Sequence, residues 1–276
     1  MSQSNLKVSF KDKVVLVTGA GCGIGYSIAK NFVASGAIVY LNDCSVELCN
    51  KAVEQIKNET EKDQIFALPF DVGINKELKG GFDQIQNENG SLDILIANAG
   101  ITNYGPFLEY SEESFNRLLS VNLQGSYFSA QSAAKQMIAQ NKKGRIILMS
   151  SVVGNRAIRN LSAYGITKAG IQMMAKSLAI ELGNYGITVN AISPGATLTE
   201  RTVMDDPDYE ANWSEVAVTN KICRVEDISS SVMFLTSDQA SQITGQTLTI
   251  DGGWTIQSPV PSAHPDIPEF SSKKLE

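Results

Sequence analysis

A tyrosine and a lysine stand four residues apart in the segment LSAYGITKAGIQMMAKSLA, residues 161–179. Residues at this spacing lie one turn apart on the same face of a helix, so the phenol of Tyr164 and the ammonium of Lys168 would face the same space. A free tyrosine has a pKa of about 10 and is a poor base at neutral pH, whereas a neighbouring cation favours its phenolate. The pair could move a proton, although taken alone it is more often an ordinary surface pair.

Glycines cluster where the first apolar run of the chain ends. Gly19, Gly23 and Gly25 lie in VTGAGCGIG, between the run KVVLVTG (13–19) and a helical pattern. Such a strand-to-helix turn needs glycine's φ freedom and lets the backbone approach a phosphate at the helix N-terminus. The spacing G-x-x-x-G-x-G differs from the usual dinucleotide fingerprint, and no Gly-Lys-Ser/Thr follows as in a P-loop. Its place after a buried strand predicts a dinucleotide site.

An acidic residue ends the second apolar run, AIVYLND (37–43). Asp43 follows Gly25 by eighteen residues. A carboxylate at this place accepts hydrogen bonds from both hydroxyls of an adenosine ribose and repels a 2′-phosphate. The alternative role is a cap on the following helix, which Ser45 could provide instead.

Composition excludes several other classes of protein. The chain has 276 residues, 43% of them hydrophobic and 19% charged, which suits one soluble α/β domain. A net charge of −6 and the lack of a basic run argue against nucleic-acid binding. We expect neither a signal peptide nor a membrane span, and the four scattered cysteines predict a reduced, cytoplasmic protein. The single histidine, His264, leaves little for a zinc or Ser-His-Asp enzyme.

Short β-branched runs alternate with longer helical patterns through residues 1–256. The runs span 13–19, 37–43, 64–70, 92–98, 144–150, 186–193 and 246–251. Several are apolar almost throughout, as strands buried on both faces are. The helical patterns include 24–35, 45–60, 114–140 and 162–183. The alternation predicts a single doubly wound, Rossmann-like α/β domain, with a parallel seven-stranded sheet and helices on both faces.

Two segments interrupt this alternation. Residues 197–222 form a polar insertion after a strand, and such insertions often cover ligands, so we expect a substrate lid there. Residues 257–276 form a proline-rich tail, which can be neither a helix nor a central strand.

Six motifs in register make the chain resemble the short-chain dehydrogenase/reductase family. They are TGAGCGIG (18–25), NAG (98–100), VNLQG (121–125), SSVVG with YGITK (150–154 and 164–168), SPGATLT (193–199) and DGGW (251–254). Together they cover about residues 10–255 in the family's order and spacing. The resemblance implies an oxidoreductase that transfers a hydride between a nicotinamide cofactor and an alcohol or ketone.

The resemblance also implies catalytic roles. Asn122, Ser151, Tyr164 and Lys168 match the family's catalytic tetrad. Tyr164 would be the acid or base, and Lys168 would lower its pKa and hold the nicotinamide ribose. Ser151 would hydrogen-bond the substrate oxygen, and Asn122 would support a water that relays protons. Ser150 has the wrong spacing for Ser151's role and is expected to support the site by packing.

Cofactor contacts follow from the same resemblance. Asp71 and Val72 match the pair beside the adenine, and Thr197 stands where the family usually has a hydrophobic residue. Relatives that bind NADP supply a cation in the glycine loop or after the second strand, where this chain has Cys22 and Cys44. We therefore expect NAD rather than NADP. The full expected set is Gly19, Cys22, Gly23, Ile24, Gly25, Asp43, Asp71, Val72, Asn98, Gly100, Tyr164, Lys168, Pro194, Gly195, Thr197 and Thr199.

Two substrate classes stay open. One is a small secondary alcohol, such as a polyol or an aldose, and the other is a 3-oxoacyl group on an acyl carrier protein. Carrier proteins are acidic and need basic docking residues, whereas the insertion has six acidic residues against Arg201 and Lys221. Carrier-linked reductases of the family also generally have an arginine where Ile180 stands. These features favour the small alcohol.

Substrate contacts are expected from Ser151 and Tyr164. Arg156 and Arg159 lie in the loop between them, where they would meet hydroxyls, an anion or only solvent. No metal is needed for this chemistry. A competing hypothesis of another class is a non-catalytic dinucleotide-binding regulator, which a broken tetrad would favour.

A homo-oligomer is also expected, most simply a homotetramer with two-fold symmetry. The resemblance implies it in part. In addition, the helical patterns at 114–140 and 162–183 carry small or apolar residues on more than one face, and one sheet covers only one face.

Overall fold

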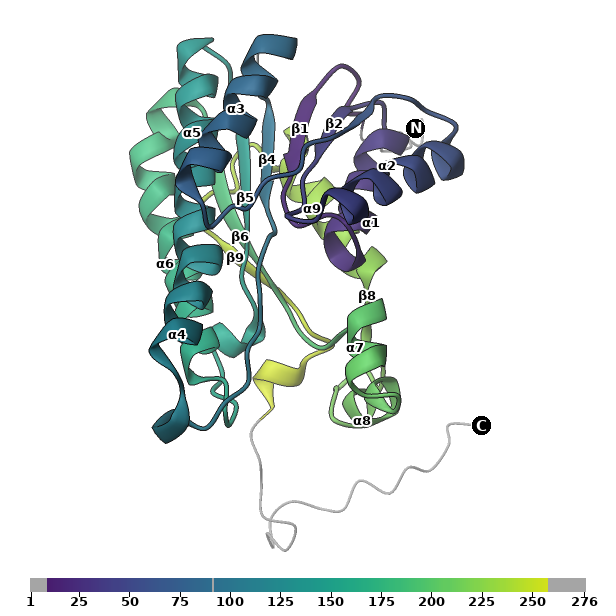
Figure 1. Cartoon of the computed structure of the whole chain (residues 1–276), viewed down its shortest axis with the longest axis vertical. Helices are drawn as coiled ribbons and strands as arrows, with labels where there is room; N and C mark the ends of the chain where they lie inside the picture. Colours follow the sequence, from purple (N-terminus) through teal and green to yellow (C-terminus); the bar gives the residue numbers. More distant parts are fainter. Residues whose placement is uncertain (1–8, 91, 258–276) are drawn as a thin grey trace, which may run out of the picture.

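Seven parallel strands form one sheet in the order β3-β2-β1-β4-β5-β6-β9 (Figure 1). The structure, a computed structural model, describes residues 9–90 and 92–257. The strands are β1 Val14–Val17, β2 Ile38–Leu41, β3 Ile65–Ala67, β4 Ile94–Ala97, β5 Arg145–Met149, β6 Thr188–Pro194 and β9 Thr247–Ile250. The predicted doubly wound, Rossmann-like sheet is therefore confirmed, with one strand in each predicted run. The proline-rich tail from residue 258 lies outside the described residues.

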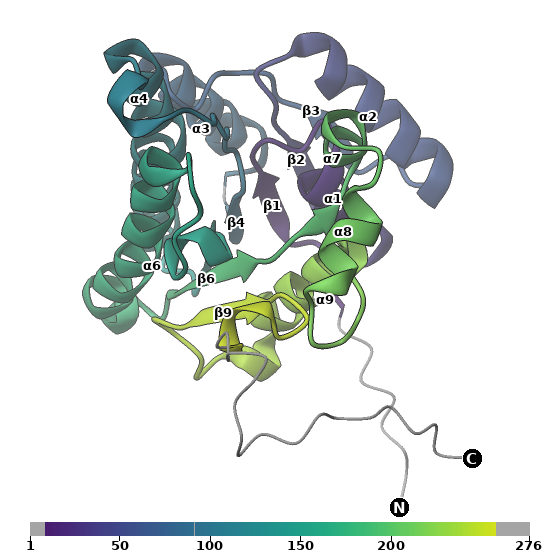
Figure 2. The same cartoon turned by 90° about the horizontal axis from the view of Figure 1, so that it is seen from below.

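Helices cover both faces of the sheet (Figures 1 and 2). One face carries α1 Gly23–Ala34, α2 Val46–Thr60 and α9 Val225–Thr236. The other carries α3 Asn75–Asn89, α4 Glu112–Leu119, α5 Ser126–Ala139 and α6 Ser162–Leu182. The pattern expected as one helix over 114–140 begins at Glu112 and is interrupted by a π-helical segment, Ser120–Gly125.

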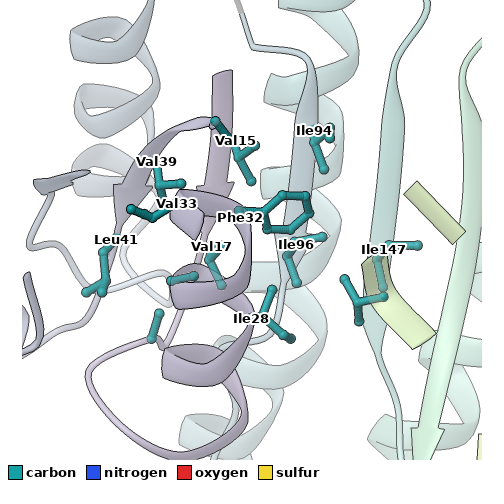
Figure 3. Close-up of a cluster of buried hydrophobic side chains, with 14 of the residues drawn as sticks. Val15, Val17, Ile28, Phe32, Val33, Val39, Leu41, Ile94, Ile96 and Ile147 are labelled. Atoms are coloured by element: carbon teal, nitrogen blue, oxygen red, sulfur yellow. The ribbon is translucent and has the colours of Figure 1, made fainter. Parts of the chain in front are cut away.

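Each strand supplies apolar side chains to both layers, because successive residues of a strand point to opposite faces. Val15 and Val17 of β1 join the core under α1, whereas Val14 and Leu16 join the core under α3, α5 and α6. Figure 3 shows the first of these cores, with Phe32 of α1 among the strand side chains. The continuous apolar runs that predicted the fold thus build two cores.

The insertion at 197–222, which we expect to be a substrate lid and call the lid below, folds as a compact segment between β6 and α9. It contains β7 Thr197–Leu198, α7 Glu200–Asp205 and α8 Tyr209–Glu215, and β7 pairs in parallel with β8 Cys223–Arg224. Figure 1 shows α7 and α8 at one end of the molecule, beyond the layers of helices. This end is where the chain leaves the carboxyl end of β6.

Two adjacent glycines of α3 give a matched test of the packing. A Cβ at Gly81 would lie 2.5 Å from Cε1 of Phe70, whereas a Cβ at Gly80 would meet nothing within 4 Å. Gly80→Ala should raise the free energy of unfolding by about 0.5–1 kcal/mol through helix propensity. Gly81→Ala should lower it by about 1–3 kcal/mol through overpacking. Urea denaturation of both variants tests this, and equal stabilities would contradict the packing described.

Candidate active site

A cleft of about 930 Å³ lies at the carboxyl ends of the strands and is bounded on one side by the lid. Gly19 follows β1, Asn98 follows β4 and Ser151 follows β5, and all three line this cleft. The strand order reverses between β1 and β4, which is the point where open parallel sheets bind ligands.

The glycine turn at the start of α1 packs so closely against the rest of the protein that two of its glycines have no room for a side chain. Gly19 has φ +60°, and a Cβ there would lie 2.6 Å from Cα of Ala99. A Cβ at Gly25 would lie 2.6 Å from Nδ2 of Asn98. That amide donates to the carbonyls of Thr18 (3.0 Å) and Gly19 (2.8 Å). Asn98 therefore ties the end of β4 to the turn, a structural role in addition to its place in the cleft.

Asp43 faces this turn from the end of β2. Its Oδ2 accepts a hydrogen bond from the backbone N–H of Gly21 at 3.1 Å, and its Oδ1 accepts from the N–H of Ser45 at 3.1 Å. The side chain of Ser45 caps α2 by accepting from Leu48 N–H at 3.2 Å. The carboxylate is thus held by two backbone donors and lines the cleft, while the helix cap belongs to Ser45.

Lys168 is almost completely buried, with 3% of its surface exposed. Its Nζ donates to the carbonyl of Met149 at 2.8 Å and lies 5.4 Å from the ring centroid of Tyr164. Burial lowers its pKa to about 8, because an ammonium loses its hydration in the interior. Ser150 fixes the helix beside it by donating from Oγ to the carbonyl of Lys168 at 2.8 Å, which agrees with the supporting role expected for Ser150.

The pKa of Tyr164 is raised in this structure, first of all by burial. Hydrogen bonds from the hydroxyls of Ser151 and Thr102 and the positive charge of Arg201 act in the opposite direction. The expected acidification of Tyr164 by Lys168 stays a prediction.

Asn122 lies in the π-helical segment and has no exposed surface. Its Oδ1 accepts from Ile101 N–H at 2.9 Å, and its Nδ2 donates to the carbonyl of Ile101 (3.0 Å) and to Oγ1 of Thr167 (3.1 Å). It does not line the cleft. A Cβ at Gly100 would lie 3.3 Å from Nζ of Lys168 and 3.4 Å from Oδ1 of Asn122, so the two polar groups approach each other across this glycine. Asn122 therefore lies behind the residues that line the cleft and contacts Ile101 and Thr167.

Most of the residues expected at the cofactor line the cleft. The exception is Gly23, whose φ is +59° and whose Cβ would lie 3.4 Å from Cγ2 of Thr199 at the base of the lid. Arg156 and Arg159, expected at the substrate, are exposed and do not line the cleft either. Nε of Arg156 instead donates to the carbonyl of Thr255 at 2.9 Å. The structure does not support a substrate contact for these two arginines.

Sequence reasoning missed several polar and aromatic residues of the cleft. Most come from the lid or from the loop after β4. In the sequence, only the mixture of polar and aromatic residues in DDPDYEANW (205–213) indicated that the lid could contribute such residues. These residues are Thr102, Tyr104, Arg117, Arg201, Tyr209 and Trp213. Nη2 of Arg117 lies 2.7 Å from Oδ2 of Asp71, so the carboxylate expected near the adenine already has a cationic partner.

Two further findings concern the described residues alone. None of their helices has the length and apolar character needed to cross a bilayer. No group of three or more histidine, cysteine, aspartate or glutamate side chains among them is arranged to hold a metal ion.

Comparisons with known proteins agree with this geometry. A family model described as enoyl-(acyl carrier protein) reductase matches residues 19–255. A short-chain dehydrogenase/reductase of Armillaria gallica is 38% identical over 251 residues, covering 87% of this chain and 95% of the relative. A 3-oxoacyl-[acyl-carrier-protein] reductase of Staphylococcus aureus is 37% identical over 243 residues, with coverages of 87% and 97%. The crystal structure of a gluconate 5-dehydrogenase from Burkholderia cenocepacia, in complex with NADP and tartrate, has a TM-score of 0.84, 28% identity and coverages of 91% and 98%.

The buried ammonium predicts a pH dependence of stability. The folded-state pKa of Lys168 is about 8 and the ordinary value is 10.5, so between these values the unfolded chain binds more protons. Unfolding free energy should therefore rise with pH across this window, by about 1–3 kcal/mol, and the rise should be absent in Lys168→Met. Denaturant unfolding of both proteins from pH 7 to 10 tests this, with Lys176→Met, an exposed lysine of α6, as control. Parallel curves for wild type and Lys168→Met would contradict it.

Proposed function

Because the chain belongs to the short-chain dehydrogenase/reductase family, we propose that it interconverts a small secondary alcohol and its ketone with NAD. The observation that carries this proposal is the grouping of Tyr164, Ser151 and Lys168 at one end of a cleft whose other end holds Asp43 and the glycine turn. A phenol, a hydroxyl and an ammonium are the groups needed to move a proton at an alcohol oxygen. A dinucleotide supplies the hydride acceptor or donor when bound.

The residues present fit such a dinucleotide. Side chains at Gly19 and Gly25 would collide with the backbone and with Asn98, so this turn requires glycines, and it brings the N-terminus of α1 to the cleft where a pyrophosphate would bind. Asp43 would accept from the hydroxyls of the adenosine ribose, while Lys168 would bind the nicotinamide ribose at the other end.

In alcohol oxidation, Tyr164 would accept the proton of the substrate hydroxyl, and it would return a proton to the carbonyl oxygen in ketone reduction. Because burial raises the pKa of Tyr164, its action as a base needs nearby positive charge, which Lys168 and a bound oxidised nicotinamide would both supply. Ser151 would hydrogen-bond the same substrate oxygen and fix its direction. Asn122 would hold Ile101 and the surroundings of Lys168, so that protons could pass from the lysine toward solvent through the space beside Gly100.

We favour NAD over NADP because, in the part of the chain that the structure describes, neither the glycine turn nor the segment directly after Asp43 carries a lysine or arginine. Cys22 in the turn and Cys44 after β2 line the cleft where a 2′-phosphate would need a positive charge. The carboxylate is also fixed by Gly21 and Ser45 N–H groups, so it cannot swing away without losing two hydrogen bonds. The gluconate 5-dehydrogenase, which shares the fold, was solved in complex with NADP, so the two coenzymes must be compared directly.

We favour a polyol or sugar-like alcohol as substrate. The runner-up is a 3-oxoacyl group on a carrier protein, which the relative from Staphylococcus aureus supports. The acidic lid opposes it, and so does Ile180, which is 82% exposed where a basic docking residue would be needed. A non-catalytic dinucleotide-binding regulator is disfavoured because all four tetrad residues are present. Absorbance at 340 nm, with NAD and a panel of alcohols and with NADH or NADPH and 3-oxoacyl substrates, separates these possibilities, and no turnover with any of them would leave the regulator.

Tyr164→Phe removes only the hydroxyl that would move the proton. Turnover should fall by about 10²–10⁴-fold, the usual contribution of general acid–base catalysis, while the fold and NADH binding persist. Steady-state kinetics, circular dichroism and NADH fluorescence measure these three properties. A variant that keeps more than about a tenth of wild-type kcat would refute the assignment.

Asp43→Ala tests the coenzyme preference. The wild type should prefer NAD by roughly 10²-fold in kcat/KM, because NADP would lose a ribose hydrogen bond and meet a like charge. Asp43→Ala should reduce the ratio of kcat/KM with NAD to kcat/KM with NADP, mainly by lowering the value with NAD. Steady-state kinetics with both coenzymes, at one pH and one salt concentration, measure this preference. Asp83→Ala, which removes an exposed acid of α3, is the control for net charge. Equal or better use of NADP by the wild type would show that the role given to Asp43 is wrong.

We also propose a homotetramer, supported by an apolar stripe on α6. Ile166, Met173 and Ile180 recur every seven residues on one face and are 58%, 60% and 82% exposed. Such a stripe suits contact with a second copy. Light scattering should give a tetramer at micromolar concentration, and Met173→Glu should reduce the mass. A monomeric wild type would contradict the proposal.

A further inference from the structure

The lid holds a tyrosine in a fixed position beside the cleft. The ring centroid of Tyr209 lies 5.8 Å from that of Trp213, which in turn lies 6.0 Å from that of Trp254. Tyr209 and Trp213 belong to α8 and line the cleft, whereas Trp254 comes from the segment after β9. These tilted and edge-to-face ring contacts hold the phenol from its apolar side.

The hydroxyl of Tyr209 has no hydrogen-bond partner among the described residues, although the side chain is half-buried. Burial, followed by the nearby Tyr104 and Tyr164, raises the pKa of Tyr209 to about 12, so the phenol is neutral and able to donate at physiological pH. Tyr209 and Tyr164 both line the cleft. Because the half-buried hydroxyl of Tyr209 has no partner from the described residues, it is available to hydrogen-bond the contents of the cleft.

Three charged side chains of the lid, Arg201, Asp205 and Asp206, line the cleft together with Tyr209. Nε of Arg201 lies 3.6 Å from Oδ2 of Asp205, and its Nη2 donates to the carbonyl of Thr102 at 3.3 Å. Asp206 accepts from Asp208 N–H at 3.0 Å and from Nδ2 of Asn212 at 3.3 Å. Since this group of one arginine and two aspartates has a net negative charge, it favours a neutral substrate over an anionic one.

We propose that Tyr209 binds the substrate by donating a hydrogen bond to a second oxygen, distinct from the oxygen that reacts at Tyr164. The substrate class is then a neutral alcohol with a further hydroxyl or carbonyl group, such as a diol, a polyol or an uncharged sugar. This inference rests on the proposed function, since it takes Tyr164 and Ser151 as the place of the reacting oxygen. Tyr209 selects among alcohols and takes no part in proton transfer.

The kinetic test compares Tyr209→Phe with wild type on butane-2,3-diol and butan-2-ol, and on cyclohexane-1,2-diol and cyclohexanol. The variant should lose roughly tenfold or more in kcat/KM on each diol and no more than about twofold on the matched alcohol, because only the diol presents a second oxygen. Tyr185→Phe, which removes the hydroxyl of an exposed tyrosine in a turn, should leave both unchanged. Equal losses on diol and alcohol, or no loss on either, would overturn the proposal.

A binding test keeps the proposal independent of turnover. The chain has two tryptophans, Trp213 and Trp254, and both lie in the ring cluster beside Tyr209. Their fluorescence, titrated with each diol in the presence of NADH, reports binding at this place. Tyr209→Phe should weaken diol binding roughly tenfold and leave the matched alcohol unchanged. Diol binding without turnover would contradict only the proposed function, whereas equal affinities of wild type and variant for the diol would contradict the role of Tyr209.

Discussion

The site depends on a lysine that is held charged where water is excluded. An isolated ammonium is costly in the interior, and Lys168 has the Met149 carbonyl as its hydrogen-bond acceptor among the described residues. The surrounding structure keeps it there: Ser150 anchors the carbonyl of Lys168, and Asn122 anchors Thr167. Burying the ammonium lowers the stability of the fold, but it keeps a positive charge beside the phenol of Tyr164. Stability and catalysis are opposed at this residue, as is common at functional sites.

The parallel sheet brings the two ends of the cleft into register. Asp43 and Tyr164 are far apart in sequence, yet both lie beyond the carboxyl ends of strands in one sheet, because every strand runs in the same direction. Asn98 couples the two ends, since it follows β4 and hydrogen-bonds to the glycine turn. The lid adds Tyr209 on the open side. In the proposed function, the sheet positions the reacting groups and a separate insertion supplies selectivity.

Residues in contiguous motifs could be predicted from the sequence, whereas residues that act across the fold could not. Apolar runs and helical periods predicted the strands, and the glycine turn and Asp43 followed from local geometry. Arg156 was expected at the substrate, but its guanidinium turns to Thr255, a partner 99 positions away that no local pattern announces. Tyr209 was missed for the same reason, since only the folded lid brings it near Tyr164. The π-helical segment around Asn122 is equally invisible to a helical period.

A crystal structure of the protein with bound NADH would test the central claim most directly. The account predicts the adenosine ribose hydroxyls on the carboxylate of Asp43, the pyrophosphate at the glycine turn and the nicotinamide ribose on Nζ of Lys168. The nicotinamide ring would then face Tyr164 and Ser151. A nucleotide bound in the opposite direction, or one that leaves Lys168 hydrogen-bonded only to Met149, would contradict it.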